Sequence, residues 1–334
     1  MQAVWMITAS FVFASMGVCV KFASAHFNSA ELVFYRGLVG VVVMAIYAHA
    51  CGTSLRTPVL AMHAWRSAIG VMSLSAWFYS IAHLPLATAM TLNYMSSIWI
   101  AVFLVGGSMM TAGAVKWAGR SAGPTQASQS PLAGNELPAL ASVGVTSQGP
   151  LVLAILASFA GVVMLLRPAM DQNQTFAGLI GLMSGIGAAF AYMQVMAISR
   201  LGEPETRTVF YFAVGTAIAG GLGMIVTGVS TWNWMHALWL PPLGILASLG
   251  QLCLTKAYAM SSRKAAASGN HNSTLMVANL QYSGIVFAAL YSLILFGDKI
   301  PLIGWAGMAL IITSAISATV LRARAAPDAP AEEH

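Results

Sequence analysis

The sequence predicts an all-α integral membrane protein whose ten transmembrane helices form two inverted five-helix repeats. Composition, charge-free stretches and an internal repeat carry this prediction. Of 334 residues, 58% are apolar and 7% are charged, whereas a soluble domain has about 45–50% apolar and about 25% charged residues. Residues 67–115 and 208–255 contain no Asp, Glu, Lys or Arg, and each stretch is long enough for two helices of about 20 residues. These observations exclude a water-soluble globular protein.

Ten apolar spans follow one another along the chain, each bounded by proline, glycine, polar clusters or charges. The first is followed by Ala23-Ser24-Ala25, which resembles a signal-peptide cleavage site. No basic residue precedes this span, so we predict a retained helix rather than a signal peptide. The shortest span is the fifth. In order, the spans are 3–22, 30–50, 64–83, 86–108, 150–167, 177–199, 208–228, 241–260, 275–297 and 301–321.

Two short segments recur at corresponding places in the two halves of the chain. Val33-Phe34-Tyr35 returns as Val209-Phe210-Tyr211, an offset of 176, and Leu92-Asn93-Tyr94 returns as Leu280-Gln281-Tyr282, an offset of 188. These segments fall in spans 2 and 7 and in spans 4 and 9. Because five helices are an odd number, the second copy enters the membrane from the opposite side, as in many transporters.

The repeat divides the chain into five parts. Residues 1–110 hold the first four helices, and 149–168 hold the fifth, which completes the first repeat. The Gly-, Ser-, Pro- and Ala-rich stretch at 111–148 has no counterpart in the second half and is predicted to be a flexible cytoplasmic insertion. Residues 176–321 form the second repeat, and 322–334 form a cytoplasmic tail.

The distribution of basic residues predicts that both termini lie in the cytoplasm, in a multi-pass protein of the cytoplasmic membrane. Eleven basic residues then lie inside and four outside. The basic residues are scattered between apolar runs, so no basic stripe for nucleic acid is expected. The inner set is Arg56, Arg66, Lys116, Arg120, Arg200, Arg207, Lys256, Arg263, Lys264, Arg322 and Arg324, and the outer set is Lys21, Arg36, Arg167 and Lys299.

The chain resembles the drug/metabolite transporter superfamily, and within it the EamA-type families of ten-helix exporters. Three segments carry the resemblance: residues 31–37 (ELVFYRG), residues 83–94 (HLPLATAMTLNY) and Phe296-Gly297-Asp298 before a Gly-rich final helix. The resemblance implies export of amino acids, aromatic ones included, across a bacterial cytoplasmic membrane. One departure is that the proline often found midway along helices 4 and 9 is replaced by Ser97 and Ile285.

The sequence contains no recognisable catalytic motif, so we predict that the protein is not an enzyme and needs no cofactor. It lacks a GxSxG, an HExxH, a phosphate-binding glycine loop and paired carboxylates within a span. Cys19, Cys51 and Cys253 are far apart and lack metal-ligand spacing, which indicates packing residues.

Polar and aromatic residues inside the spans are the candidate substrate-binding residues, because a polar group within a membrane needs a partner or a cavity. Amide groups can hold a carboxylate or ammonium, and aromatic rings can pack apolar groups and attract cations. Helix-to-helix hydrogen bonding is the alternative role for each of them. The candidates are Trp77, Tyr79, Ser80, His83, Asn93, Tyr94, Gln251, Lys256, Asn279, Gln281 and Tyr282.

Lys256 and His83 each leave two interpretations open. Lys256 can meet a substrate carboxylate or phosphate, or extend to the cytoplasmic headgroups. His83 can couple flux to protons, or form an interfacial hydrogen bond. No carboxylate is predicted at mid-membrane, which disfavours proton exchange on a central glutamate.

The sequence thus predicts a lipid-embedded carrier that exports a small metabolite, with an amino acid as the first choice, by alternating access between the repeats. Two alternatives stay open. One is a carrier of anionic sugar or nucleotide metabolites, favoured if Lys256 faces the cavity. The other is a non-transporting membrane subunit or receptor that uses residues 111–148 for docking. The sequence does not determine the oligomeric state.

Overall fold

A computed structural model describes residues 1–100, 102–103, 153, 156–157, 160–164, 172–268 and 272–325. These parts of the chain are helices joined by turns, with no strand among them. The predicted insertion at 111–148 lies outside the described residues, as do most of the fifth span and residues 326–334.

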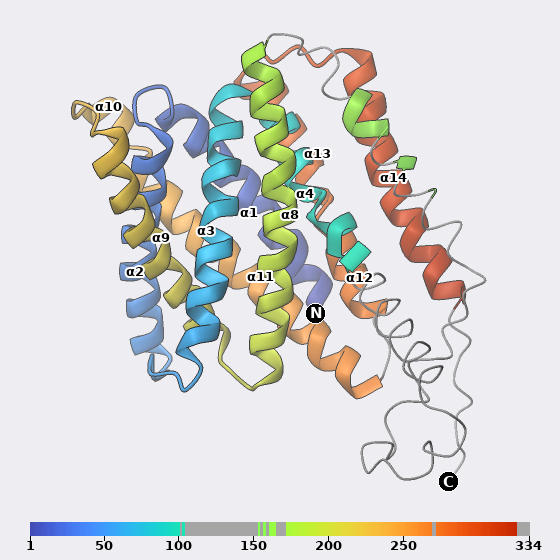
Figure 1. Ribbon diagram of the computed structural model, residues 1–334, viewed down its shortest axis with the longest axis horizontal. Coiled ribbons are helices and arrows are strands. Elements are labelled where there is room, and N and C mark those ends of the chain that lie inside the picture. The colour runs from blue at the N-terminus through green and yellow to red at the C-terminus, as the bar shows by residue number, and fades with distance from the viewer. Residues whose placement is uncertain are drawn as a thin grey trace, which may run out of the picture.

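The helices of the described ranges pack side by side in one bundle (Figure 1). Most of them match a predicted span to within a few residues. Their bounds are α1 Gln2–Ala23, α2 Ser29–Ala50, α3 Leu60–His83, α4 Leu86–Tyr94, α8 Gln172–Arg200, α9 Glu205–Thr227, α10 Trp234–Ala237, α11 Leu240–Ser268, α12 Asn272–Leu280, α13 Ser283–Leu295 and α14 Leu302–Ala325.

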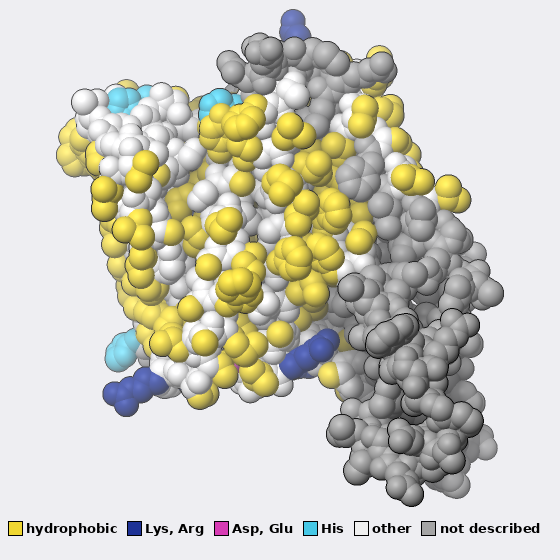
Figure 2. All heavy atoms as spheres, in the orientation of Figure 1, with side chains coloured by type: hydrophobic (Ala, Val, Ile, Leu, Met, Phe, Trp, Pro, Cys, Tyr) yellow, Lys and Arg dark blue, Asp and Glu magenta, His cyan; other side chains and the backbone are white. Residues whose placement is uncertain are grey.

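Six helical segments are long and apolar enough to cross a membrane, and each matches a predicted span. The flank of the bundle that Figure 2 shows is covered largely by apolar side chains. Many large apolar residues of α2, α3, α8 and α9 are exposed, including Ile46, Met72, Leu179 and Ile225. Such a surface suits contact with lipid and would be unfavourable in water. The fold is therefore that of a multi-pass membrane protein, while the count of ten helices stays a prediction.

Glycine allows a close helix contact between α2 and α9. A Cβ on Gly37 would lie 2.3 Å from the backbone nitrogen of Ala217, and a Cβ on Gly220 would lie 2.4 Å from that of Phe34. Only glycine fits at both places, because the atoms in the way belong to backbone. The α2–α9 pair is therefore tightly packed, at one edge of the bundle in Figure 1.

The fourth and ninth spans, predicted as continuous helices, are both broken at repeat-related positions. α4 ends at Tyr94 and helix resumes at Ser96, and α12 and α13 are separated by Gln281 and Tyr282. Proline is absent from both breaks, so packing and side-chain hydrogen bonds produce them. The Ser97 hydroxyl donates to the Ala278 carbonyl at 2.7 Å.

The two breaks also touch each other. A Cβ on Gly284 would lie 2.4 Å from the ring of Tyr94, so this glycine makes room for the tyrosine where α13 crosses α4. The Ser10 hydroxyl of α1 donates to the Gln281 carbonyl at 3.3 Å. The Ser97 and Ser10 hydroxyls thus each add a second hydrogen bond to a carbonyl at this break that also accepts a backbone N–H.

At the end of the bundle where α2 begins, Asn28, Glu31, Gly228 and Ser230 form what we call the Glu31 network. The Glu31 carboxylate accepts hydrogen bonds from the Ser230 backbone nitrogen at 2.9 Å and the Ser230 hydroxyl at 2.6 Å. It also accepts from the Asn28 nitrogen at 2.8 Å, and the Asn28 amide donates to the Gly228 carbonyl at 3.1 Å. This network fixes the loop after α9 to the start of α2.

At the opposite end, where α9 begins, Ser54, Thr57, Glu203 and Arg207 form the Arg207 network. The Arg207 guanidinium donates to the Ser54 carbonyl at 2.6 Å and to the Glu203 carboxylate at 3.2 Å. The Thr57 hydroxyl donates to Glu203 at 3.1 Å. This network fixes the loop after α2 to the start of α9.

Candidate functional site

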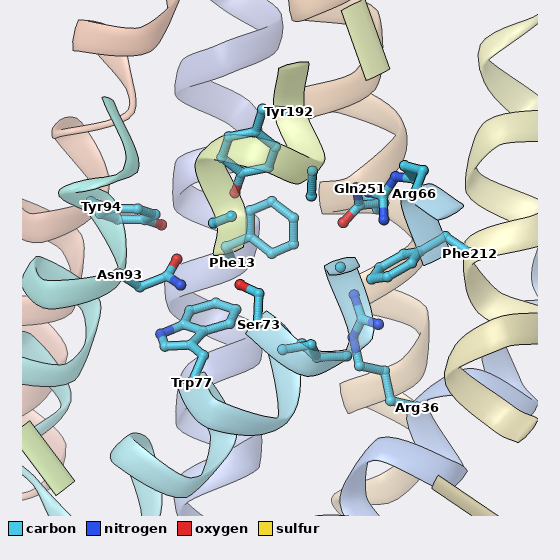
Figure 3. A pocket seen from close by; sticks show the side chains of 14 residues that line it. Phe13, Arg36, Arg66, Ser73, Trp77, Asn93, Tyr94, Tyr192, Phe212 and Gln251 are labelled. Carbon is cyan, nitrogen blue, oxygen red and sulfur yellow. The ribbon is translucent and has the colours of Figure 1, made fainter. Parts of the chain in front are cut away.

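A cavity lies inside the bundle and is lined by side chains from seven helices (Figure 3). About 40 Å³ of its space is far enough from the walls to hold the centre of a water molecule. That space suits a few waters, so a larger ligand requires the walls to move apart. The lining residues are Phe13, Arg36, Arg66, Gly70, Ser73, Leu74, Trp77, Asn93, Tyr94, Ala188, Ala191, Tyr192, Phe212 and Gln251.

Two arginines form one side of this cavity (Figure 3). Arg36 extends from α2 and Arg66 from α3, and they are only 4% and 2% exposed. Both guanidinium groups lie near the Phe212 ring, with Cζ 5.2 Å from its centroid for Arg36 and 3.9 Å for Arg66. A Cβ on Gly70 would lie 2.4 Å from Nη1 of Arg66, so this glycine leaves the space that the guanidinium occupies.

Both arginines have nitrogen atoms without a partner. Within the described residues, Nε of Arg36 and both Nε and Nη1 of Arg66 are buried and make no hydrogen bond. Every described salt bridge involves other residues. An unpaired buried charge is unfavourable unless a ligand or counter-ion compensates it.

Trp77, Asn93 and Tyr94 lie across the cavity from the arginines (Figure 3). The Asn93 amide donates to the Ser184 hydroxyl at 3.0 Å, which fixes its orientation against α8. The indole nitrogen of Trp77 and the hydroxyl of Tyr94 are buried without a partner among the described residues. The Tyr94 hydroxyl points into the cavity, whereas Trp77 turns the six-membered ring of its indole toward it (Figure 3).

Behind Tyr192, a group of hydrogen-bonded residues connects the cavity to the break between α12 and α13. The Gln281 side-chain amide donates from Nε2 to the Tyr192 hydroxyl at 3.3 Å, and its Oε1 accepts from the Tyr258 hydroxyl at 3.4 Å. The rings of Tyr192 and Tyr258 stack with centroids 5.2 Å apart. Movement at this break would therefore reach the cavity wall through Gln281 and Tyr192.

The structure brings four of the predicted site residues together in the cavity: Trp77, Asn93, Tyr94 and Gln251. Gln281 lies directly behind its wall through Tyr192. Tyr282 is buried at the same helix break, and Asn279 lies one turn before it in α12.

The other four predicted site residues lie away from the cavity. Ser80 donates to the Ala177 carbonyl at 2.7 Å and joins α3 to α8. Tyr79 stacks on His83 at 4.2 Å at the end of α3, where His83 is exposed. Lys256 places its ammonium 4.7 Å from the Trp5 ring centroid, where it has a cation–π contact and does not line the cavity.

Arg36 and Arg66 were predicted among the basic residues of the outer and inner sides, but the structure does not expose them as topology charges would be. Both side chains are buried in the bundle, because the guanidinium of Arg66 folds toward Gly70 and that of Arg36 reaches Phe212. Without them, ten basic residues remain on the predicted inner side and three on the outer. One signal was available in the sequence, since Arg36 follows five residues after Glu31, well inside an apolar span.

Comparison with known proteins finds similar chains along nearly the whole length, although no family model matches. The pseudopaline exporter CntI of Pseudomonas aeruginosa is 26% identical over 317 residues, which cover 93% of each chain. An uncharacterized transporter of Helicobacter pylori is 24% identical over 319 residues, covering 93% of this chain and 91% of the relative. The riboflavin transporter of Vibrio cholerae is 23% identical over 326 residues, covering 93% and 90%.

A protein of known crystal structure shares the fold, with a TM-score of 0.61 at 18% identity over 97% of this chain and 98% of that one. The three named relatives are transporters, and the described helices are apolar enough to cross a membrane. Together, the relatives and the fold support a membrane transporter.

Proposed function

We propose that this protein is a carrier that exports a small organic metabolite across the cytoplasmic membrane by alternating access between two inverted five-helix halves. The observation that carries the proposal is the polar and aromatic cavity inside the bundle, next to two broken helices. Transporters place their substrate near the membrane midplane at such breaks. Export as the direction rests on the relative that is named an exporter.

The packing of the two halves supports the inverted repeat. In the predicted repeat α1 corresponds to α8, and α3 corresponds to α11. The structure packs α1 on α11 and α3 on α8, so each of these contacts is the repeat-related copy of the other. Gly40 contacts Ala213, and the equivalent pair at an offset of 176, Gly37 and Thr216, is also in contact. α1 and α8 run in opposite directions in Figure 1, as do α2 and α9, which suits halves of opposite orientation.

The lining of the cavity suits a metabolite that carries a carboxylate. Guanidinium groups bind carboxylates with two parallel hydrogen bonds, and aromatic rings such as Trp77 and Phe212 pack an apolar portion of a substrate. Amino acids meet both requirements, and they remain the first class to test. No Asp or Glu of the described part of the chain lines the cavity. This favours uniport or substrate exchange over proton exchange on a central acidic residue.

The proposal is tested by counterflow in proteoliposomes. Proteoliposomes that contain the purified protein are preloaded with a mixture of unlabelled amino acids and small organic acids. We expect them to accumulate labelled members of that mixture saturably, above the level of liposomes without protein. Folded protein that exchanges none of these solutes would contradict a carrier function. Repeating the assay with a pH gradient reveals proton coupling.

Two tryptophans of α3 give a matched pair of variants for this assay. Trp77 lines the cavity, whereas Trp65 is 60% exposed on the outer surface. We expect Trp77→Phe to lower the rate of counterflow about tenfold, since the larger indole ring is lost from the cavity wall, and Trp65→Phe to leave the rate unchanged. Equal rates of counterflow for the two variants would contradict a role of the cavity in transport.

A further inference from the structure

We infer that the cavity takes a substrate with two negative charges on oxygen atoms, as in a dicarboxylate or a phosphate ester, with one charge held by Arg36 and the other by Arg66. This inference rests on the proposed function and narrows its substrate class from carboxylate-bearing metabolites in general to dianions. It is based on two buried, unpaired guanidinium groups that face the same cavity.

The carboxylates of the described chain do not neutralise these arginines, because each already has partners elsewhere. Glu31 accepts from Ser230, and Glu203 pairs with Arg207. Glu205 pairs with Arg263 at 3.0 Å. The Asp298 carboxylate accepts from the Ser292 hydroxyl at 2.5 Å. Within the described residues, the two positive charges of the cavity therefore lack a protein counter-ion.

The contacts of the two guanidinium groups leave nitrogen atoms free for a ligand. The Phe212 ring covers a face of each group in a cation–π contact. The gain from such a contact is smaller than the free-energy cost of burying a charge. The unpaired nitrogens of Arg66 and Arg36 remain available, and their planar fork matches the oxygens of a carboxylate or phosphate.

The repeat shows that packing does not require arginine at these positions. Arg36 corresponds to Phe212 at the offset of 176. Ser67 of α3 contacts Gly215 of α9, and the same kind of contact joins Gly244 of α11 to Val39 of α2. Aligning these two contacts gives an offset of 177 between α3 and α11. At this offset Arg66 corresponds to Leu243.

The second half of the protein thus has apolar residues where the first half has two cations. Leu243 is fully buried and Phe212 is 5% exposed, so this fold accommodates apolar side chains at both kinds of position. A role in ligand binding accounts for the charges where packing does not.

The number of charges separates a dianion from a zwitterionic amino acid. The two guanidinium groups repel each other electrostatically, and a single carboxylate would compensate only one of them. An ammonium group in the same cavity would find no carboxylate among the described lining residues. A substrate with two anionic groups neutralises both arginines and introduces no unpaired cation.

The test is ligand-induced thermal stabilisation of the full-length protein in detergent at constant ionic strength. The probes are succinate, phenyl phosphate, phenylalanine as a zwitterion, and sodium chloride. We expect succinate or phenyl phosphate to raise the unfolding temperature above the values with phenylalanine and chloride, because only a bound ligand stabilises the folded state. A comparison of the shifts in unfolding temperature with succinate and with phenyl phosphate distinguishes recognition of carboxylates from recognition of phosphates.

Arg36→Gln and Arg66→Gln are expected to weaken dianion binding about tenfold or more each, since each loses a charge-assisted pair. Without ligand, their unfolding temperatures should equal or exceed that of the wild type, because an uncompensated buried charge is removed. A purely structural role would lower these temperatures. Arg36→Lys and Arg66→Lys keep the charge if the glutamine variants fail to fold, and should retain part of the response. The matched control is Arg56→Gln at an exposed site.

The inference is overturned if neither dianion stabilises the wild type beyond chloride, or if the stabilisation survives in both glutamine variants. Its failure is distinguishable from failure of the proposed function. Counterflow of phenylalanine without any stabilisation by dianions would support the carrier function and contradict the dianion-binding site. Stabilisation by a dianion without counterflow of any solute would support the dianion-binding site and contradict the carrier function.

Discussion

The Glu31 network and the Arg207 network occupy equivalent places at opposite ends of the α2–α9 pair, yet they use opposite charges. Residues 31 and 207 are related by the offset of 176, as are Ser54 and Ser230. Glu31 accepts hydrogen bonds from Ser230, whereas Arg207 donates one to the carbonyl of Ser54. Gly52 and Gly228, related by the same offset, both have positive φ angles, +64° and +78°.

At both ends of the α2–α9 pair a loop is fixed to the start of the neighbouring helix, but the charge that fixes it has the opposite sign. A loop end offers both N–H and C=O groups, so a carboxylate or a guanidinium can hold it equally well. The Arg207 network also contains the ion pair with Glu203, and His63 lies 3.6 Å from that carboxylate. We therefore expect the two ends to respond differently to substitution and to salt.

The largest effect should come from the glycines that hold α2 against α9, because both networks depend on this contact. Gly37→Val and Gly220→Val each place side-chain atoms against backbone, so we expect the free energy of unfolding to fall by about 3 kcal/mol or more. The measurement is thermal unfolding in detergent, together with recovery of monodisperse protein. Gly221→Ala is the control, since its Cβ would lie 3.5 Å from the Phe34 ring, an ordinary contact. A fully stable Gly37→Val protein would contradict the close α2–α9 contact.

A smaller effect should separate the two networks. Arg207→Gln leaves the buried Glu203 without its ion pair and should lower the free energy of unfolding by about 2 kcal/mol. Glu31→Gln keeps one acceptor oxygen for Ser230 and should lower it by about 1 kcal/mol. Chemical denaturation by urea of both variants provides the comparison.

The two networks should also differ in how their stability depends on salt. At 1 M sodium chloride the loss in Arg207→Gln should shrink, since its guanidinium is partly exposed and the pair is screened in the wild type. The loss in Glu31→Gln should stay the same, because its partners are a backbone N–H and hydroxyl rather than an opposite charge. Equal losses and equal salt dependence at the two ends would show that the charges play no separate roles.

Gly52→Ala should have an effect as small as that of Glu31→Gln. A Cβ on Gly52 or Gly228 meets no atom within 4 Å, so an alanine there introduces only backbone strain. We expect Gly52→Ala to lower the free energy of unfolding by about 1 kcal/mol. Gly228→Ala should lower it by about 2 kcal/mol, because the φ of 78° and ψ of 177° at Gly228 lie in a region that essentially only glycine adopts. Parallel urea titrations of the two variants measure this, and equal losses would contradict the special conformation of Gly228.

Much of the fold followed from the sequence, since apolar runs and their boundaries are local properties. α1, α2, α8 and α9 match their predicted spans to within a few residues. The breaks in spans 4 and 9 were not predicted, because the proline that would mark them is absent. They arise from contacts between distant residues, such as Ser97 with Ala278 and Tyr94 with Gly284.

The candidate site was predicted less well. Trp77 and Ser80 were both predicted as site residues, but a single sequence could not say that Trp77 lines a cavity while Ser80 joins α3 to α8. Arg36 and Arg66 were counted as end charges, because the rule that places arginine at membrane boundaries holds for side chains that reach water.

The sequence by itself determined that this chain leaves water for lipid and where most of its helices begin and end. The reason is that transfer of apolar side chains from water is roughly additive along the chain and needs no knowledge of neighbours. Only the tertiary structure decided which polar groups meet in the cavity and which remain unpaired. The partners of Arg36 and Arg66, and their lack of a described carboxylate, depend on helices far apart in the sequence that pack at close range.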